Sequence, residues 1–381
     1  MIIGTNRETK AQEYRVGLLP DGVEALTARG HGVLVQRGAG AAAGFTDAAY
    51  AGAGATLVDD GAEVFEKADM IVKVKEPMAW EYGLMRPGQL LFTYIHSAGN
   101  RPLCDALVQS GVRGLAFEDV ETDDGRLPLL EPMSMVAGYL GMLRGIDLLS
   151  ALCGNPGLLP GGLPGVRPAR VLVLGGGFVG RGALKVAHGL GADVTVLDLD
   201  PDVLARLALE FPRARTLLST PANLRTALRG TDLLLNAVMW PPGRGGHLVT
   251  RAMVRDMPSH AVIVDVSADI GGAIETCLRQ TTHDAPTYVE EGRTHYVVAN
   301  IPSAAGRSSS EALSAVTLPW VLRLADLGFA QALLAHPPLL RGLTCMDGHI
   351  VREQTARWLG CAALGGGPVR ARLQSEADAA P

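Results

Sequence analysis

The feature that most constrains the fold of this chain is an apolar run that leads directly into three regularly spaced glycines. Residues 171–174 are Val-Leu-Val-Leu and predict a buried strand; Gly175, Gly177 and Gly180 follow in the pattern G-x-G-x-x-G, and residues 181–187 continue at helical periodicity. Gly175 permits a tight turn, Gly177 lets the backbone approach a pyrophosphate, and Gly180 lets the helix pack closely on the strand. The helix N-terminus then offers unpaired N–H groups to the phosphates. The segment predicts a dinucleotide-binding domain.

The next predicted strand ends in a carboxylate that favours NAD over NADP. Residues 192–197 form an apolar run, and Asp198 lies 18 residues after Gly180. A carboxylate at this place accepts hydrogen bonds from the adenosine ribose and repels a 2′-phosphate, and residues 199–202 contain no arginine that would attract one. The alternative is that the glycines serve only close packing and that Asp198 is a solvated strand end. On the NAD interpretation, the further cofactor-binding residues are Phe178, Val179, Val238, Val266 and Val298.

Short apolar runs alternate with helix-compatible stretches in two series, which predicts an α/β fold with two Rossmann-like, doubly wound sheets. The predicted strands of the first series are 31–35, 70–74, 89–95 and 112–117, and those of the second are 169–174, 192–197, 232–238, 261–266 and 296–299. The Gly- and Pro-rich residues 154–165 predict a domain boundary. Residues 133–152 and 310–327 predict two long helices, and the polar tail after Gly366 is expected to fray.

Composition narrows the possible function classes. With 381 residues the chain is long enough for two domains, and its 48% hydrophobic and 19% charged residues are typical of soluble globular proteins. No apolar run is long enough to span a membrane and the N-terminus turns polar too early for a signal peptide, so a cytoplasmic location is expected. The net charge of -5, spread without long runs, gives no reason to expect nucleic acid or an anionic membrane as a partner. Five cysteines without CxxC spacing disfavour a disulfide framework and a zinc site, and no metal is expected.

Two reactive side chains follow neighbouring predicted strands of the first series. The chain has only five lysines; Lys73 and Lys75 lie in and just after one strand, which Pro77 stops, and the next strand delivers His96. Since the carboxyl ends of adjacent parallel strands meet at one edge of a sheet, we expect Lys75 and His96 in one crevice, as a hydrogen-bond donor and an acid–base group. The alternatives are that the lysines protect an exposed edge strand from aggregation, and that His96 is a packed or capping residue.

Two more charged residues are candidates for the same edge of the sheet. Arg15 lies in the loop after the first short strand, and its planar guanidinium can bind a substrate carboxylate with two parallel hydrogen bonds. The alternative for Arg15 is a surface ion pair with Glu8 or Glu13. Glu118 ends another strand, where it either orients the basic cluster or caps the following turn.

The second series also delivers polar residues at strand ends. Residues 262–272 carry a strand into a loop with two carboxylates, Asp265 and Asp269. We expect Asp269 to face the nicotinamide and the substrate ammonium, and Asp265 to fix the loop. Asn300 follows a later strand and can bond the carboxamide or ribose of the cofactor.

Together these segments resemble the alanine dehydrogenases, in the family shared with the NAD-binding subunit of proton-translocating transhydrogenase. The matching segments are 8–16, 72–77, 91–96, 127–134, the glycine pattern, 265–272 and 298–300. They occur in the family's order and spacing and extend from residue 1 to about residue 328. Such agreement is far more specific than a single glycine pattern.

The resemblance implies a domain organisation and an assembly. The NAD-binding Rossmann domain, residues 136–307, is inserted into a substrate domain made of residues 1–135 and 308–381, and long helices join the two. The family also implies a homo-oligomer, either a hexamer or a dimer or trimer.

The resemblance further implies roles for single residues. Arg15 matches the residue that binds the substrate carboxylate, and Lys75 matches the one that holds the 2-oxo group. The matching catalytic acid–base groups are His96 and Asp269. On the cofactor side the matching residues are Ser134, Asp198 and Asn300, and further substrate-binding residues are Tyr94, Glu118, Met133 and Asn300.

The predicted function is an NAD-dependent L-amino-acid dehydrogenase, with alanine as the first substrate: L-alanine, NAD and water are converted reversibly to pyruvate, ammonia and NADH. The chain departs from the family pattern at Met135 and Tyr139, which replace an acid and a base, and in a bulky loop around Trp240. The alternatives are a dehydrogenase for another small amino acid, and an opine-type or N-carboxyalkyl amino-acid dehydrogenase that condenses a 2-oxo acid with an amine. A third is a non-catalytic NAD-binding module of the transhydrogenase kind.

Overall fold

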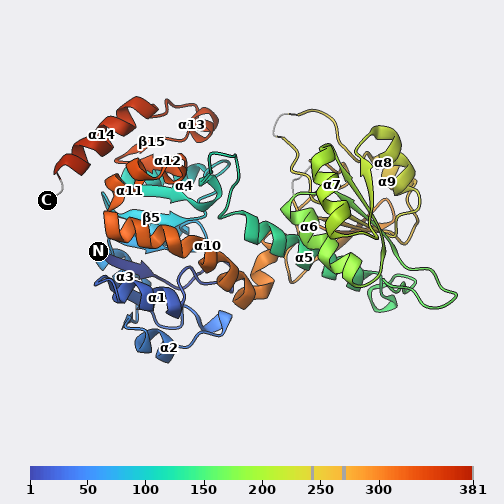
Figure 1. The fold of residues 1–381 in the computed structure, drawn as a ribbon, viewed down its shortest axis with the longest axis horizontal. Helices are drawn as coiled ribbons and strands as arrows, with labels where there is room; N and C mark the ends of the chain where they lie inside the picture. Colours follow the sequence, from blue (N-terminus) through green and yellow to red (C-terminus); the bar gives the residue numbers. More distant parts are fainter. Residues whose placement is uncertain (242–243, 268–271, 380–381) are drawn as a thin grey trace. The chain divides into compact units, whose positions relative to one another are not determined.

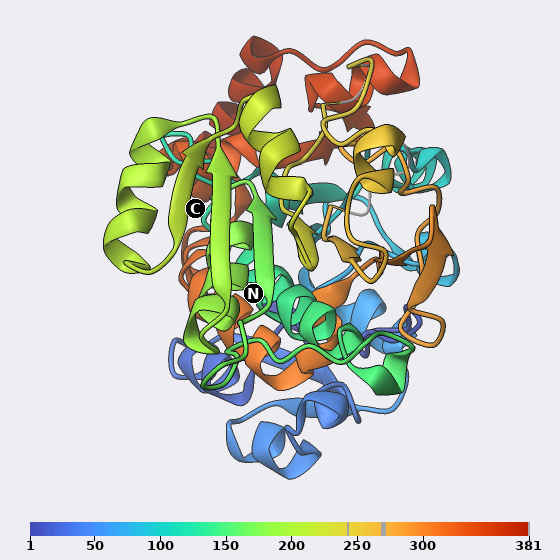
Figure 2. The ribbon, with the colours of Figure 1, turned by 90° about the vertical axis from the view of Figure 1, so that its right-hand side faces the viewer.

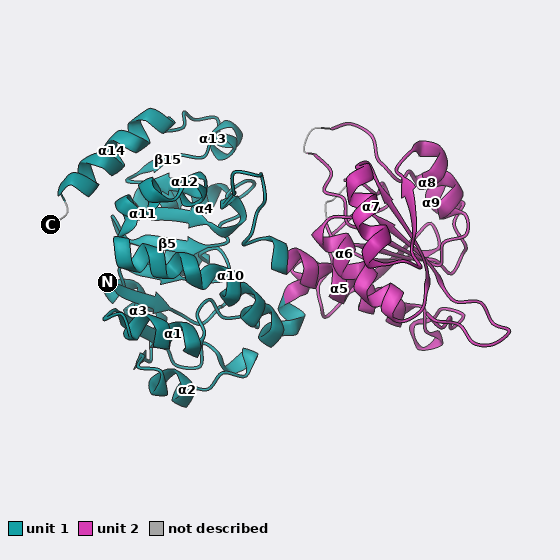
Figure 3. Cartoon of the chain, in the orientation of Figure 1, with its two compact units in different colours: residues 1–132, 303–381 teal, residues 133–302 magenta. Residues whose placement is uncertain are grey.

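The computed structural model describes residues 1–241, 244–267 and 272–379. The chain divides into two compact units, of which unit 1 comprises Met1–Pro132 with Ser303–Pro381 and unit 2 comprises Met133–Pro302 (Figure 3). Unit 2 is therefore one continuous insertion in the sequence of unit 1. The sequence predicted these two borders a few residues later, at 135/136 and 307/308.

Unit 1 is built around an eight-stranded sheet in the order β15-β14-β6-β5-β4-β1-β2-β3. Strands β1 to β6 are parallel, whereas β14 is antiparallel to β6 and β15 to β14. The strand order reverses between β1 and β4, where a doubly wound sheet opens a crevice at the carboxyl ends of its strands. The strands are β1 (Ile2–Thr5), β2 (Gly32–Gln36), β3 (Thr56–Val58), β4 (Met70–Val72), β5 (Leu90–Thr93), β6 (Arg113–Ala116), β14 (Leu343–Met346) and β15 (His349–Ile350).

Helices surround this sheet in Figure 1, with the long helix α10, in orange, close to β5. Its helices are α1 (Pro20–Thr27), α2 (Asp47–Gly52), α3 (Gly61–Lys67), α4 (Arg101–Ser110), α10 (Gly306–Leu327), α11 (Phe329–Ala335), α12 (Pro337–Arg341), α13 (Glu353–Leu359) and α14 (Gly366–Ala379).

Unit 2 contains a seven-stranded sheet in the order β12-β13-β11-β10-β7-β8-β9, parallel except for β12. Figure 2 shows several of its strands, in green and lime, running side by side. The strands are β7 (Arg170–Leu174), β8 (Asp193–Asp198), β9 (Arg215–Leu218), β10 (Leu233–Asn236), β11 (Val262–Asp265), β12 (Thr287–Glu290) and β13 (Arg293–Tyr296). The helices are α5 (Glu131–Leu148), α6 (Phe178–Gly189), α7 (Pro201–Glu210), α8 (Pro221–Leu228) and α9 (Arg251–Arg255).

The apolar run that predicted β7 is buried on both faces of its sheet. Val171 and Val173 belong to one core cluster, and Leu172 and Leu174 to another. Continuous apolar strands of this kind are typical of parallel sheets that are covered on both sides. The predicted α/β class with two mostly parallel, doubly wound sheets is confirmed.

Three local predictions were wrong. Residues 154–165 do not form a domain boundary but lie inside unit 2, where backbone bonds from Leu158 to Leu149 and from Ala169 to Leu159 hold this segment. The strand predicted at 296–299 ends at Tyr296.

The third concerns the tail after Gly366, which does not fray. It forms α14, which packs against α11 and buries Val369 and Leu373. Two buried apolar side chains per four turns are enough to hold a polar helix, because its stability comes from packing rather than propensity.

Candidate active site

Lys75 follows β4 in unit 1, where the strand order reverses between β1 and β4. Strand β4 pairs with β1 on one side and β5 on the other, and both Lys73 and Lys75 are buried. A gatekeeping lysine requires an exposed edge strand, so that interpretation of the pair is wrong.

The two buried lysines have different surroundings. Lys73 donates a 2.7 Å bond to Glu81, which also accepts one of 2.7 Å from Asn6. For Lys75, by contrast, no residue within the described ranges is found to accept a hydrogen bond from the ammonium. Burial, followed by the positive charges of Arg15 and Lys10, lowers the pKa of Lys75 to about 8. Lys75 is thus a buried cation placed to donate to a ligand.

His96 follows β5 in the left-handed backbone region, with a φ of 46°. Glu118 fixes this conformation, since its carboxylate accepts bonds of 2.6 Å from the His96 N–H and 3.1 Å from the Ile95 N–H. The imidazole is 48% exposed, stacks on Tyr94 at a ring separation of 5.7 Å, and lies 3.5 Å from the Glu118 carboxylate. Desolvation and the nearby Lys75 charge lower the pKa of His96, which favours the neutral imidazole at neutral pH.

Tyr94 and Glu118 were predicted to bind substrate, and the structure shows what their polar groups contact. The Tyr94 hydroxyl donates a 2.6 Å bond to the Leu129 carbonyl, and burial raises its pKa. The Glu118 carboxylate binds backbone N–H groups, as the orienting interpretation of this residue expected. Both residues hold the segment that carries His96.

Arg15 is buried and forms a bidentate ion pair with Glu13. Glu13 accepts 2.6 Å bonds from both Nε and Nη2 of Arg15, and a 3.1 Å bond from its backbone N–H. The pairing with Glu13 that the sequence left open is therefore present, but it is buried and not on the surface. A bidentate carboxylate fixes the plane of the guanidinium.

Sequence reasoning named Glu8 and Glu13 only as possible surface partners of Arg15, and it missed Glu81. Glu8, Glu13 and Glu81 have almost fully buried side chains. The sequence contained a signal for these carboxylates, because a lysine or an arginine buried at a strand end requires a carboxylate partner. Glu13 lies within ten residues of Arg15, Glu81 within ten residues of Lys73, and Glu8 within ten residues of the first strand.

The glycine turn of unit 2 has the geometry that the pattern predicts. Gly175 has a φ of 89°, and a side chain at Gly180 would lie 1.9 Å from the Gly175 carbonyl. A side chain at Gly177 would meet open space, so a phosphate group has room to approach its backbone. Phe178 and Val179 begin α6 directly after this turn. The turn fits a dinucleotide.

Asp198 ends β8 beside the glycine turn. Its carboxylate accepts a 2.6 Å bond from the Gly176 N–H and a 2.9 Å bond from the Asp200 N–H. Asp198 borders a pocket of about 630 Å³ within unit 2. Its other lining residues include Gly175, Gly177, Leu199, Ser219, Thr220, Val238, Trp240 and Arg244.

The loops after β10 and β11 are tied together by buried polar groups. Asn236 donates a 2.9 Å bond to Asp265, and Asp265 accepts one of 3.2 Å from the Ser267 N–H. Asp265 thus fixes the loop that begins at Val266, while the predicted catalytic residue Asp269 lies outside the described residues.

The remaining predicted residues lie at two other places in unit 2. Met133 and Ser134 are in the first turns of α5, with Met133 buried. Val298 is buried after β13, and Asn300 follows with a φ of 64°, in the left-handed region that asparagine tolerates.

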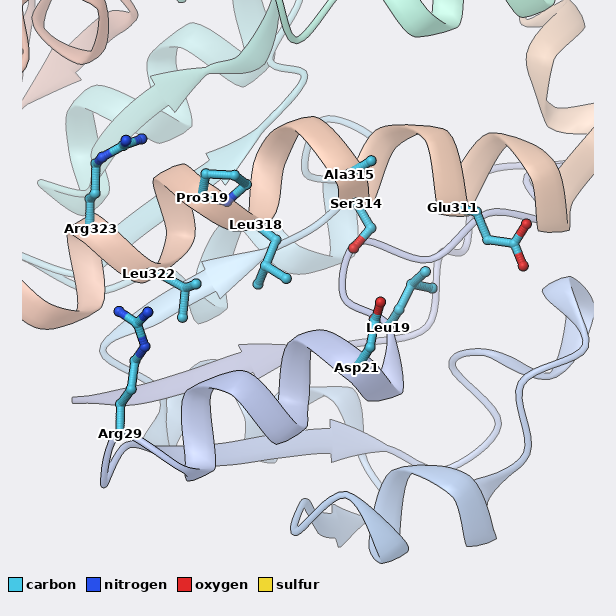
Figure 4. A pocket seen from close by; sticks show the side chains of 10 residues that line it. All are labelled: Leu19, Asp21, Arg29, Glu311, Ser314, Ala315, Leu318, Pro319, Leu322 and Arg323. Atoms are coloured by element: carbon cyan, nitrogen blue, oxygen red, sulfur yellow. The ribbon is translucent and has the colours of Figure 1, made fainter.

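A hollow of about 480 Å³ in unit 1 lies between α1 and α10 and contains none of the predicted site residues (Figure 4). Leu318 and Leu322 line it, with Asp21 and Glu311 toward one end and Arg29 and Arg323 toward the other.

Within the described ranges no three His, Cys, Asp or Glu side chains are grouped to hold a metal ion. The five cysteines are free thiols. None of the described helices is both long and apolar enough to cross a membrane.

Two family models match the chain. Residues 4–137 match the N-terminal domain of alanine dehydrogenase/PNT, and residues 142–353 match its C-terminal domain. The chain belongs to the alanine dehydrogenase/PNT family. The relationship that the sequence motifs indicated is thereby confirmed.

Members of the alanine dehydrogenase/PNT family that resemble this chain include the alanine dehydrogenase of Methanococcus maripaludis, 44% identical over 94% of this chain and 96% of that protein. The alanine dehydrogenase of Mycobacterium tuberculosis is 44% identical over 94% of this chain and 97% of its own length. A solved L-alanine dehydrogenase matches with a TM-score of 0.90 at 42% identity, over 94% of this chain and 99% of that one. The transhydrogenase from Sinorhizobium meliloti shares the fold, with a TM-score of 0.77 at 23% identity, 93% coverage of this chain and 100% of that one.

Proposed function

We propose that this protein is an NAD-dependent alanine dehydrogenase, which interconverts L-alanine, NAD and water with pyruvate, ammonia and NADH. One observation carries the proposal: a buried lysine with a lowered pKa lies at the crevice of unit 1 in a chain that is 44% identical to curated alanine dehydrogenases over 94% of its length. The sheet crevice and the buried cation are the features of a site that binds an anionic carbonyl compound.

Two buried cationic side chains of unit 1, Arg15 and Lys75, bind the substrate. Arg15, whose plane is fixed by Glu13, binds the carboxylate of pyruvate or alanine. Lys75 donates a hydrogen bond to the oxo group and stabilises the negative charge that develops on its oxygen when ammonia adds. Met133 and Asn300 remain predicted substrate contacts, and Tyr94 and Glu118 act through His96.

Proton transfer falls to His96 together with Asp269. The neutral imidazole accepts a proton from the attacking ammonia and returns it to the hydroxyl that leaves as water. Glu118 keeps the ring in place through the backbone of His96. Asp269 remains a predicted partner in these steps.

The nucleotide is held by unit 2. The open backbone at Gly177 and the carboxylate of Asp198 fit a pyrophosphate and an adenosine ribose, and they favour NAD over NADP. When bound, NAD accepts a hydride from the substrate carbon and NADH returns it. The further predicted cofactor contacts are Ser134, Gly175, Phe178, Val179, Gly180, Val238, Val266, Asp269, Val298 and Asn300.

This proposal includes the domain roles that the sequence predicted: unit 1 as the substrate domain and unit 2 as the NAD domain. It also includes a cytoplasmic homo-oligomer, of the kind that the family resemblance implies.

A substrate panel tests the activity. NADH oxidation is expected with pyruvate plus ammonium, and only weakly when the ammonium is replaced by amino acids. NADPH should support much slower turnover than NADH. Turnover that requires an amino acid as the amine would contradict the proposal and favour the opine-type alternative, while a larger 2-oxo acid preferred over pyruvate would indicate another amino acid as the substrate.

The pH dependence of the reaction reports on Lys75. Because the pKa of Lys75 is about 8, its ammonium form is present below this pH and is lost as the pH rises through it. With NADH saturating and free ammonia held constant, kcat/KM for pyruvate is expected to fall about tenfold per pH unit above about pH 8. A profile that stays flat to about pH 10 would contradict this assignment.

A further inference from the structure

Unit 1 contains a buried cluster of charged side chains that the proposed reaction does not use. Lys73 lies between two carboxylates, 2.7 Å from Glu81 and 3.5 Å from Glu8. Glu81 also accepts bonds from Asn6 and from the Met78 N–H. The side chains of Lys73, Glu8 and Glu81 are at most 2% exposed.

Glu8 differs from Glu81 in what it contacts. Its Oε1 accepts a 2.6 Å bond from the Val74 N–H and a 3.3 Å bond from the Lys75 N–H. The β1–β4 ladder ends at the pair Gly4 and Ile71, so beyond this pair Glu8 provides the acceptor that a neighbouring strand would otherwise provide.

The other side of the same segment is also fixed. The Tyr94 N–H donates a 3.3 Å bond to the Val74 carbonyl, and the Thr93 hydroxyl donates one of 2.9 Å to the Lys75 carbonyl. The backbone of Lys75 is therefore held between β5 and a single carboxylate. The two bonds to Glu8 come from the segment after β1, 66 and 67 residues earlier in the chain.

The burial of the Glu8 carboxylate has a free-energy cost that its bonds must offset. Burial raises the pKa of Glu8, and the Lys73 ammonium opposes this rise. A buried carboxylate is costly unless its oxygens are bound, and a charged acceptor binds backbone N–H groups about twice as strongly as a neutral one. The bonds to the Val74 and Lys75 N–H groups and the nearby Lys73 ammonium offset this cost.

We propose that Glu8 is a positioning residue, which holds the backbone at Val74 and Lys75 so that the Lys75 ammonium reaches the oxo group of the substrate. This proposal rests on the function proposed above. It assigns Glu81 a structural role only, because Glu81 contacts no backbone group of Val74 or Lys75.

Glu8→Met and Glu81→Met form a matched pair, since each removes one carboxylate beside Lys73 and keeps the side-chain length. Both are expected to lower the melting temperature. Only Glu8→Met is expected to lower kcat with pyruvate and ammonium, by about 30-fold or more, while the KM for NADH changes by less than about twofold. Glu8→Gln retains an acceptor oxygen and is expected to recover at least about a tenth of wild-type kcat.

A second readout does not depend on turnover. Trinitrobenzenesulfonate labels lysine amines, and the labelling of Lys75 is measured by mass spectrometry relative to the exposed Lys67 in the same chain. Glu8→Met is expected to change the Lys75 labelling rate at least about fivefold, and Glu81→Met less than about twofold.

Equal effects of the two Met variants on kcat and labelling would overturn the proposal, as would a Glu8→Gln variant no better than Glu8→Met. The two proposals fail in different ways. If the wild-type protein turns over no amino acid, the proposed function fails, while the labelling contrast still shows whether Glu8 positions Lys75.

Discussion

Replacing Lys75 by Met is expected to reduce turnover of pyruvate, ammonium and NADH roughly 10³-fold. The variant removes the one side chain that we assign to the substrate oxo group and leaves the apolar part of its length in place. Since unit 2 contains the glycine turn and Asp198, the Kd for NADH should change by less than about twofold. Steady-state kinetics and NADH fluorescence titration measure the two quantities separately.

The same variant should not destabilise the protein. Burial lowers the pKa of Lys75 to about 8, which means that the folded state pays to keep this ammonium charged at neutral pH. Removing the charge removes that cost, so the melting temperature of Lys75→Met is expected to stay constant or to rise. A gain in stability with a loss of activity is the signature of a functional residue kept in an unfavourable environment.

Lys67→Met is the matched control. Lys67 is in α3, is half-exposed, and forms a surface ion pair with Glu63 four residues earlier, so its loss should leave kcat within about twofold. Lys75→Arg keeps the charge with another shape, and should retain less than about a tenth of wild-type kcat because the planar guanidinium does not fit where the buried ammonium lies. Full activity in Lys75→Met would remove the basis of the proposed mechanism.

The sequence predicted those parts of the site that depend on local rules. Lys75 and His96 were predicted because a parallel sheet presents chemistry at its strand ends, and Gly175, Gly177 and Gly180 because their predicted roles require a missing side chain. Both kinds of inference use only neighbours in the sequence.

The contacts that Glu8 and Glu81 make with distant parts of the chain could not be found in this way. Glu8 reaches Val74 across 66 residues, and Glu81 reaches Asn6 across 75 residues. Such pairs exist only once β1 and β4 lie side by side, so they depend on the tertiary arrangement. The helix α14 escaped prediction for the same reason, since its stability comes from packing against α11 and not from its own sequence.

The Asp198→Ser variant is expected to shift the nucleotide preference from NAD toward NADP. Charge-assisted bonds to ribose hydroxyls contribute about 1.5–3 kcal/mol, so the loss of this carboxylate should raise the KM for NAD roughly 10- to 100-fold. The repulsion of a 2′-phosphate is lost at the same time. We therefore expect turnover with NADP to increase while turnover with NAD falls, which a kcat/KM ratio for the two nucleotides measures.

The structure shows a cation that can favour NADP once the Asp198 carboxylate is removed. No arginine follows Asp198 directly, but Arg244, from the loop after β10, lines the same pocket and stacks on Trp240 at 4.5 Å. With the negative charge gone, Arg244 is the cation to which a 2′-phosphate is drawn, so the gain with NADP should disappear in the double variant Asp198→Ser, Arg244→Ala.

The control for the Asp198 variant is Asp202→Ser, an exposed acid in the first turn of α7, which should leave the preference unchanged. Asp198 also accepts bonds from the Gly176 and Asp200 N–H groups, so part of the effect on NAD comes from a loosened glycine turn. Asp198→Asn separates the two contributions, because its amide oxygen can still bind an N–H group while the charge is absent. If Asp198→Asn and Asp198→Ser lose NAD affinity equally and neither gains activity with NADP, the carboxylate holds the turn and does not choose the nucleotide.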